Sequence, residues 1–201
     1  MGKDRGFDRI EAALKRAVSA LRDADVPFLL GGSLASWARG GPETRHDLDL
    51  MIKPEDAERA LQALEAAGMR PERPPEEWLY KAWDGDVLID LIFGPRGLEM
   101  TDEVLARGER LSVLSLDVPV MALEDMLATK LQALDEHSLD YSPALQIARA
   151  LREQIDWAEL RSRTAASPYA SAFFTLVEEL GIAEATDARR ASVRVIGKAA
   201  R

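Results

Sequence analysis

Gly31, Gly32 and Ser33 form a short stretch directly after the apolar run 26–30. Glycine has no side chain and adopts positive φ readily, so the backbone here can approach a ligand closely. The segment that follows reads as a helix, and its first N–H groups, with the hydroxyl of Ser33, could donate hydrogen bonds to phosphate oxygens. The same residues are also common in ordinary turns, so this stretch alone leaves both interpretations open.

Asp47 and Asp49 follow about a dozen residues later, in the segment 47–52, whose polar–apolar alternation predicts a half-buried strand. Alternate residues of a strand point to one face, so we expect the two carboxylates to share a face while Leu48 and Leu50 enter the core. Two like charges about 4 Å apart repel by about 4 kcal/mol at an effective dielectric of about 20. A cation that takes hard oxygen ligands, such as Mg²⁺, would compensate for that repulsion.

Asp90 interrupts the run 87–93, which is otherwise apolar enough for a central strand. A buried carboxylate without a partner is costly, and either an arginine or a cation shared with Asp47 and Asp49 would remove the cost. Three carboxylates on neighbouring strands can hold two metal ions, the arrangement used for in-line phosphoryl transfer. The order Gly-Gly-Ser, Asp-x-Asp and third Asp therefore favours a phosphate and metal site over a solvated strand face.

Hydrophobic period and turn residues predict the elements that must position these side chains. Helices are expected within 8–24, 33–38 (with Ser33 as N-cap), 53–68, 122–136, 143–155, 168–181 and 183–190. Strands are expected at 26–30, 47–52, 78–83, 87–93 and 110–116, with a hairpin turn at 84–86. The predicted fold is α/β (α+β): a core with a small mixed β-sheet over 1–118, then a helical lobe over 119–201, with the active cleft between them.

The composition narrows the class of protein. The chain has 201 residues, a formal net charge of −9 and a sequence pI of about 4.9, and this acidity argues against binding nucleic acid over the whole surface. The absence of cysteine excludes disulfides and thiolate metal sites, and two histidines, His46 and His137, are too few for a histidine-rich metal site. We expect a cytoplasmic protein without membrane contact, because the sequence contains no long apolar segment and its start does not resemble a signal peptide.

The order of these motifs resembles that of the DNA polymerase β-type nucleotidyltransferase superfamily. In that superfamily a Gly-Ser turn follows the first strand, then an Asp-x-Asp pair, then a third carboxylate on a later strand; the matching residues here are Gly32, Ser33, Asp47, Asp49 and Asp90. The resemblance implies metal-dependent transfer of a nucleoside monophosphate from an NTP to an acceptor hydroxyl. The three aspartates would be catalytic and would hold two Mg²⁺ ions, and Gly32 and Ser33 would bind the NTP.

The segment 118–151 is similar to the helical region of the AbiEii-type group, which includes nucleotidyltransferase toxins of toxin–antitoxin pairs. This resemblance implies that Lys130 and Asp140 bind the nucleotide, although the basic residue that usually precedes the aspartate is absent from this chain. Lys130 also lies on the apolar stripe of its predicted helix, beside Leu127 and Leu131. A lysine there either extends from the edge of the core into solvent or directs its ammonium into the cleft, against a triphosphate.

Two kinds of acceptor fit these features. The AbiEii-like segment and the basic tail 189–201 favour an RNA end, such as that of a tRNA modified by a toxin with an antitoxin partner, and we expect this acceptor. The acidic net charge instead favours a small cationic antibiotic, an aminoglycoside or a lincosamide.

Two other functions are less favoured. A catalytically silent binding protein of the same fold would typically have lost a carboxylate or the Gly-Ser pair, and this chain keeps them all. A hydrolase with Ser33 as nucleophile and His137 as base would need its serine later in the chain and a larger sheet.

Overall fold

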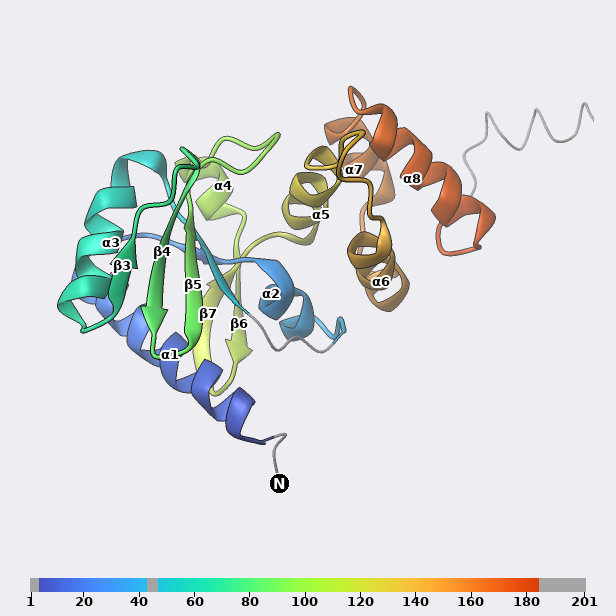
Figure 1. The fold of residues 1–201 in the computed structure, drawn as a ribbon. Coiled ribbons are helices and arrows are strands. Elements are labelled where there is room, and N and C mark those ends of the chain that lie inside the picture. The colour runs from blue at the N-terminus through green and yellow to red at the C-terminus, as the bar shows by residue number, and fades with distance from the viewer. Residues whose placement is uncertain (1–3, 43–46, 185–201) are drawn as a thin grey trace, which may run out of the picture.

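The computed structural model describes residues 4–42 and 47–184, which form a mixed sheet followed by a group of helices (Figure 1). The strands are β1 (Leu29–Leu30), β2 (Leu48–Met51), β3 (Arg70–Glu72), β4 (Leu79–Asp84), β5 (Val87–Ile92), β6 (Glu109–Val113) and β7 (Leu116–Val120). Their order is β3-β4-β5-β2-β1-β7-β6, with β2 parallel to β5, β1 parallel to β7 and the other neighbours antiparallel. The mixed α/β core expected from the sequence is confirmed.

Two helices, α1 (Asp4–Asp23) and α3 (Ala57–Ala66), pack against each other and against β5. Leu48 and Leu50 of β2 belong to the same buried core as Leu14 of α1 and Leu61 of α3, and none of the four is exposed. Because side chains alternate along a strand, Asp49 must project from the opposite face of β2. The apolar core therefore fixes which way the candidate site faces.

The helical part contains α5 (Leu123–Gln132), α6 (Ser142–Leu151), α7 (Trp157–Arg163) and α8 (Pro168–Glu179). Figure 1 shows these helices grouped beside the sheet. α5 contacts each of the other three, and Phe173 and Phe174 of α8 are among the largest buried side chains of the core. α5 also follows β7 after Met121 and Ala122, so it connects this group to the sheet.

A buried ion cluster fixes α5 to the core. Asp125 in the first turn of α5 is completely buried, and it accepts two hydrogen bonds from Arg107, which follows the short helix α4 (Asp102–Ala106). The distances are 3.1 Å from Nε to Oδ2 and 3.0 Å from Nη2 to Oδ1. Arg163, at the end of α7, also pairs with Asp125. A buried carboxylate needs such partners, so the cluster sets the position of α5 relative to the sheet.

The structure differs from the expected elements in a few places. The prediction that Ser33 caps a helix is wrong: the N-cap of α2 (Gly32–Ala38) is Gly31, two residues earlier, because Gly31 has extended dihedrals and its carbonyl accepts a hydrogen bond from Ala35 N. The single strand expected at 110–116 is instead the start of a hairpin, β6 and β7, whose turn residues Leu114 and Ser115 have positive φ.

Several short elements were not predicted, namely β3, α4 and α7, and the first turn of the helix expected at 53–68 is a 3₁₀ turn, Pro54–Asp56. The helix expected at 183–190 lies, from residue 185 onward, outside the described residues. Within 4–42 and 47–184, no helix combines the length and the apolar character that a membrane crossing requires.

Replacing Arg107 by Met should lower the free energy of unfolding by about 3 kcal/mol, because the buried Asp125 would lose its bidentate partner. Arg110→Met is a matched control, since it removes the same charge from an exposed pair with Asp117, and should cost less than about 1 kcal/mol. Denaturant unfolding near neutral pH measures both. Equal effects of the two substitutions would contradict the anchoring role of Arg107.

Candidate nucleotide and metal site

Gly32 and Asp49 are packed so closely that no other residue fits at position 32. A Cβ on Gly32 would lie 1.6 Å from Oδ2 of Asp49, and Gly32 has a φ of +59°, which side-chain-bearing residues rarely adopt. The N–H of Gly31 also donates to the backbone carbonyl of Asp49, with an N–O distance of 2.8 Å. The Gly-Gly pair therefore brings the first strand and the Asp-x-Asp strand into direct contact.

The Asp49 carboxyl lies in an environment that disfavours its charge. Burial raises its pKa from 3.8 to about 6, and the negative charges of Asp90 and Asp47 act in the same direction, whereas Lys130 and Lys81 oppose the shift. Asp47 is exposed and immediately precedes β2. The structure thus brings the predicted carboxylates within electrostatic reach of one another, without enough positive charge from the protein to compensate.

Asp90 lies directly beside Asp49, because β2 and β5 are parallel with these two residues in register. It accepts a hydrogen bond from Lys81 of β4, with 2.9 Å between Nζ and Oδ1, and Lys81 is its partner in the β4–β5 register. Burial raises the pKa of the Asp90 carboxyl, and the Lys81 hydrogen bond acts in the opposite direction. Asp90 therefore has a lysine partner, where the sequence suggested an arginine or a cation.

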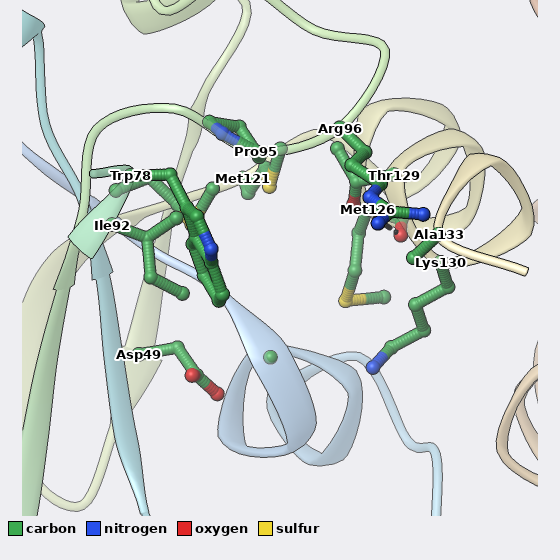
Figure 2. A pocket seen from close by; sticks show the side chains of 12 residues that line it. Asp49, Trp78, Ile92, Pro95, Arg96, Met121, Met126, Thr129, Lys130 and Ala133 are labelled. Atoms are coloured by element: carbon green, nitrogen blue, oxygen red, sulfur yellow. Dashed lines mark hydrogen bonds between the residues drawn. The ribbon is translucent and has the colours of Figure 1, made fainter. Parts of the chain in front are cut away.

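A pocket of about 460 Å³ opens beside Asp49, between the sheet and α5 (Figure 2). Its polar lining comes from Gly32, Asp49, Arg96, Thr129 and Lys130. Its apolar lining comes from Met51, Trp78, Ile92, Pro95, Met121, Met126 and Ala133. Figure 2 shows Trp78 on the side of Asp49, with Met126 and Lys130 of α5 across the pocket. Lys130 thus lines the cleft, which matches the second of its two predicted orientations.

The donor set fits a hard divalent cation. Asp47 and Asp49 offer carboxylate oxygens; burial raises the pKa of Asp49, the negative charges of Asp90 and Asp47 raise it further, and a bound cation would favour the charged carboxylate. Across the described residues, no three acidic or histidine side chains lie close enough to enclose an ion by themselves. Mg²⁺ is commonly held by one or two carboxylates together with substrate phosphates and water, so the arrangement suits an ion whose other ligands are water or nucleotide phosphates.

Other sequence-predicted residues lie outside the pocket lining. Ser33 is half-buried in the first turn of α2. Asp140 is exposed and accepts a hydrogen bond from the backbone N–H of Ser142 at 2.8 Å, so its contact in the structure orders the start of α6. His46 falls outside the described residues, and His137 is exposed beside Glu136.

Trp78 and Lys81 belong to the site but were not predicted as part of it. Lys81 could have been found from the sequence, because the hairpin turn at 84–86 pairs Asp84 with Val87 and hence Lys81 with Asp90. Trp78 precedes β4 and is 45% exposed at the pocket. No local pattern indicated that position, because it depends on how α5 packs across from the sheet.

In metal-free protein, Asp49→Asn should raise the free energy of unfolding near neutral pH by on the order of 2 kcal/mol. The folded protein binds a proton at Asp49 more tightly than the unfolded chain, so this group makes wild-type stability fall as the pH rises from 3.8 to about 6. An asparagine does not ionise, so the variant does not lose stability in this way as the pH rises. Denaturant unfolding with a chelator, across this pH range, should show a difference that grows with pH; a constant difference would contradict the raised pKa.

Comparison with known proteins shows the family and the fold of the chain. Residues 8–188 match the family described as "Uncharacterised nucleotidyltransferase". The crystal structure of ANT(2'')-Ia in complex with adenylyl-2''-tobramycin is similar, with a TM-score of 0.59, 16% identity, and coverage of 81% of this chain and 98% of that one.

The solution structure of the antibiotic-resistance factor ANT(2'')-Ia gives a TM-score of 0.57 and 18% identity, covering 85% and 96% of the two chains. These likenesses show a shared fold. No curated protein matches the chain. Since the family match spans most of the sequence, the protein belongs to this nucleotidyltransferase family.

Proposed function

We propose that the protein uses a divalent cation and an NTP to transfer a nucleoside monophosphate to a hydroxyl group of a small molecule. The observation that carries this proposal is that one pocket joins Gly32 at the start of α2 and Asp49 of β2 to Lys130 of α5. The sequence placed these residues in two separate motifs, and the fold brings them to opposite walls of one cavity. A nucleotide would bridge those walls.

The pocket has the two chemical surfaces that a nucleotide requires. The Lys130 ammonium and the bare Cα of Gly32 can accommodate phosphate groups. The indole of Trp78 and the side chains of Met121 and Met126 offer an apolar surface for a base, and aromatic rings stack well on nucleobases. A volume of about 460 Å³ is within the usual range for small-molecule sites.

Asp47 and Asp49 would hold the cation, most simply Mg²⁺. When bound, the ion supplies positive charge that stabilises the phosphates during transfer. Lys130 would hold the triphosphate from the opposite wall, and Gly32 would keep the Asp49 carboxylate in place. Most of the rate enhancement would then come from positioning and charge compensation, as in other phosphoryl transfers.

Asp90 would act as the base that accepts the proton of the acceptor hydroxyl. In the proposed reaction the acceptor oxygen attacks the α-phosphorus of the NTP, a new P–O bond forms, and the bond from the α-phosphorus to the bridging oxygen breaks. Pyrophosphate leaves, and the proton of the acceptor hydroxyl passes to the Asp90 carboxylate. The register of Asp90 with Asp49 on the neighbouring strand supports this assignment.

Several features support a small acceptor rather than RNA. In the described part of the pocket lining, Arg96 and Lys130 are the cationic residues, and two positive charges are few for binding a polynucleotide. The net charge of −9 favours a cationic acceptor. One protein of similar fold was solved with an adenylylated aminoglycoside, adenylyl-2''-tobramycin. The toxin hypothesis instead depends on the AbiEii resemblance of 118–151 and on the basic tail 189–201. That tail lies outside the described residues.

Purified protein incubated with Mg²⁺, each α-labelled NTP and either aminoglycosides, lincosamides or total RNA tests the acceptor directly. We expect label in a small cationic product, and none with Asp49→Asn. Asp117→Asn, which removes the same charge from an exposed surface pair, should keep full activity. Label found in RNA alone, together with growth arrest on expression that Asp49→Asn abolishes, would establish the toxin function and overturn this proposal.

Gly32→Ala should reduce transfer by at least about a hundredfold, because the new Cβ would displace the Asp49 carboxylate. Gly85→Ala is the matched control: Gly85 also has positive φ (63°), but open space surrounds it, in the β4–β5 turn. Both should lose about 1 kcal/mol of stability from backbone strain. Steady-state transfer rates separate them, and equal activity of the two variants would contradict the role of Gly32.

Trp78→Ala and Lys130→Met should weaken ligand binding in different ways. Trp78→Ala should weaken ATP by about tenfold, from lost stacking, and leave inorganic tripolyphosphate unchanged. Lys130→Met should weaken both ligands, since it removes a charge that pairs with phosphate. Calorimetric titration of the two ligands measures this. If Trp78→Ala weakens tripolyphosphate as much as ATP, the base does not lie on the indole.

A further inference from the structure

A row of charged side chains crosses the sheet beside the pocket. Glu72 on β3 is in register with Lys81 on β4, Lys81 with Asp90 on β5, and Asp90 with Asp49 on β2. Residues in register on neighbouring strands project from the same face and interact directly. One lysine therefore lies within a line of three carboxylates, between the edge strand and the candidate metal site.

The two carboxylates nearest the pocket are held by groups on opposite sides. Oδ2 of Asp49 lies against Gly32, on the β1 side of its strand. Oδ1 of Asp90 lies 2.9 Å from Nζ of Lys81, on the β4 side. The Asp90 and Lys81 side chains are only 17% and 25% exposed, so this ion pair is shielded from water more than a surface pair would be.

We infer that Lys81 is a positioning residue that holds Asp90 away from the metal ion, so that the nucleotide-free protein binds a divalent cation through Asp47 and Asp49 without Asp90. The inference rests on the proposed function, because it assigns Asp90 to the acceptor hydroxyl. It differs from the arrangement expected from the sequence, in which all three aspartates hold two ions.

The physical reason is competition for one carboxylate. A cation that approached Asp90 would have to displace a hydrogen-bonded ammonium, and it would be repelled by that ammonium at close range. Lys81 also supplies, on this side of the site, positive charge that a second ion would otherwise supply. The absence of any three-ligand acidic cluster from residues 4–42 and 47–184 agrees with this division.

Titration of the nucleotide-free protein with Mn²⁺, with free ion counted by electron paramagnetic resonance, tests the inference without any transfer reaction. Asp49→Asn should weaken Mn²⁺ binding by at least about tenfold, whereas Asp90→Asn should change it less than about threefold. Lys81→Met should tighten binding by about tenfold, because Asp90 becomes available as a ligand, and adding Asp90→Asn to that variant should remove the gain.

Two further variants separate positioning from general charge effects. Lys15→Met removes the same charge from an exposed helix pair with Glu11 and should leave Mn²⁺ binding unchanged. Lys81→Arg keeps a cationic donor opposite Asp90 and should bind Mn²⁺ as the wild-type protein does. Thermal melting of each variant verifies folding, and Asp90→Asn gives an independent comparison if Lys81→Met does not fold.

A loss of tenfold or more in Asp90→Asn would show that Asp90 is an ion ligand and would overturn the inference. So would equal Mn²⁺ affinity in the wild-type protein, Lys81→Met and the double variant. Since the measurement uses only the ion, a protein that transfers no nucleotide to any acceptor would refute the proposed function and leave this inference to be decided by the Mn²⁺ data.

Discussion

The close packing of the Asp49 carboxylate against the bare Cα of Gly32 is the constraint on which the rest of the site depends. It requires glycine at position 32, fixes the approach of the first strand to β2, and holds a carboxylate where burial raises its pKa to about 6. A protein keeps such an unfavourable charge when a ligand compensates for it. We propose that a divalent cation and the phosphates of an NTP are that ligand, which explains why the contact occurs in a nucleotidyltransferase.

The opposite wall of the pocket depends on a different interaction, the buried pairing of Asp125 with Arg107. Asp125 lies five residues before Lys130 on the same helix, so the ion cluster that anchors α5 also sets where the Lys130 ammonium points. The sheet thus supplies carboxylates to the pocket, and α5 supplies the positively charged side chain of Lys130. In our proposal, the triphosphate lies between them.

Local patterns in the sequence predicted much of this arrangement. Strand alternation correctly placed Asp49 opposite the buried Leu48, and the Asp-Gly turn correctly indicated the β4–β5 hairpin. The Leu114–Ser115 turn was missed because neither residue usually favours positive φ. The contact of Arg107 with Asp125 and the position of Trp78 arise from the packing of distant segments, which no local pattern encodes. The roles of individual site residues stay predictions.

A crystal structure with a non-hydrolysable ATP analogue and Mn²⁺, with the ion located by its anomalous scattering, tests the central claim most directly. We predict Mn²⁺ at the Asp49 carboxylate, phosphates between Gly32 and Lys130, and the base against Trp78. An ordered nucleotide outside this pocket, or phosphates that contact neither Gly32 nor Lys130, would contradict it.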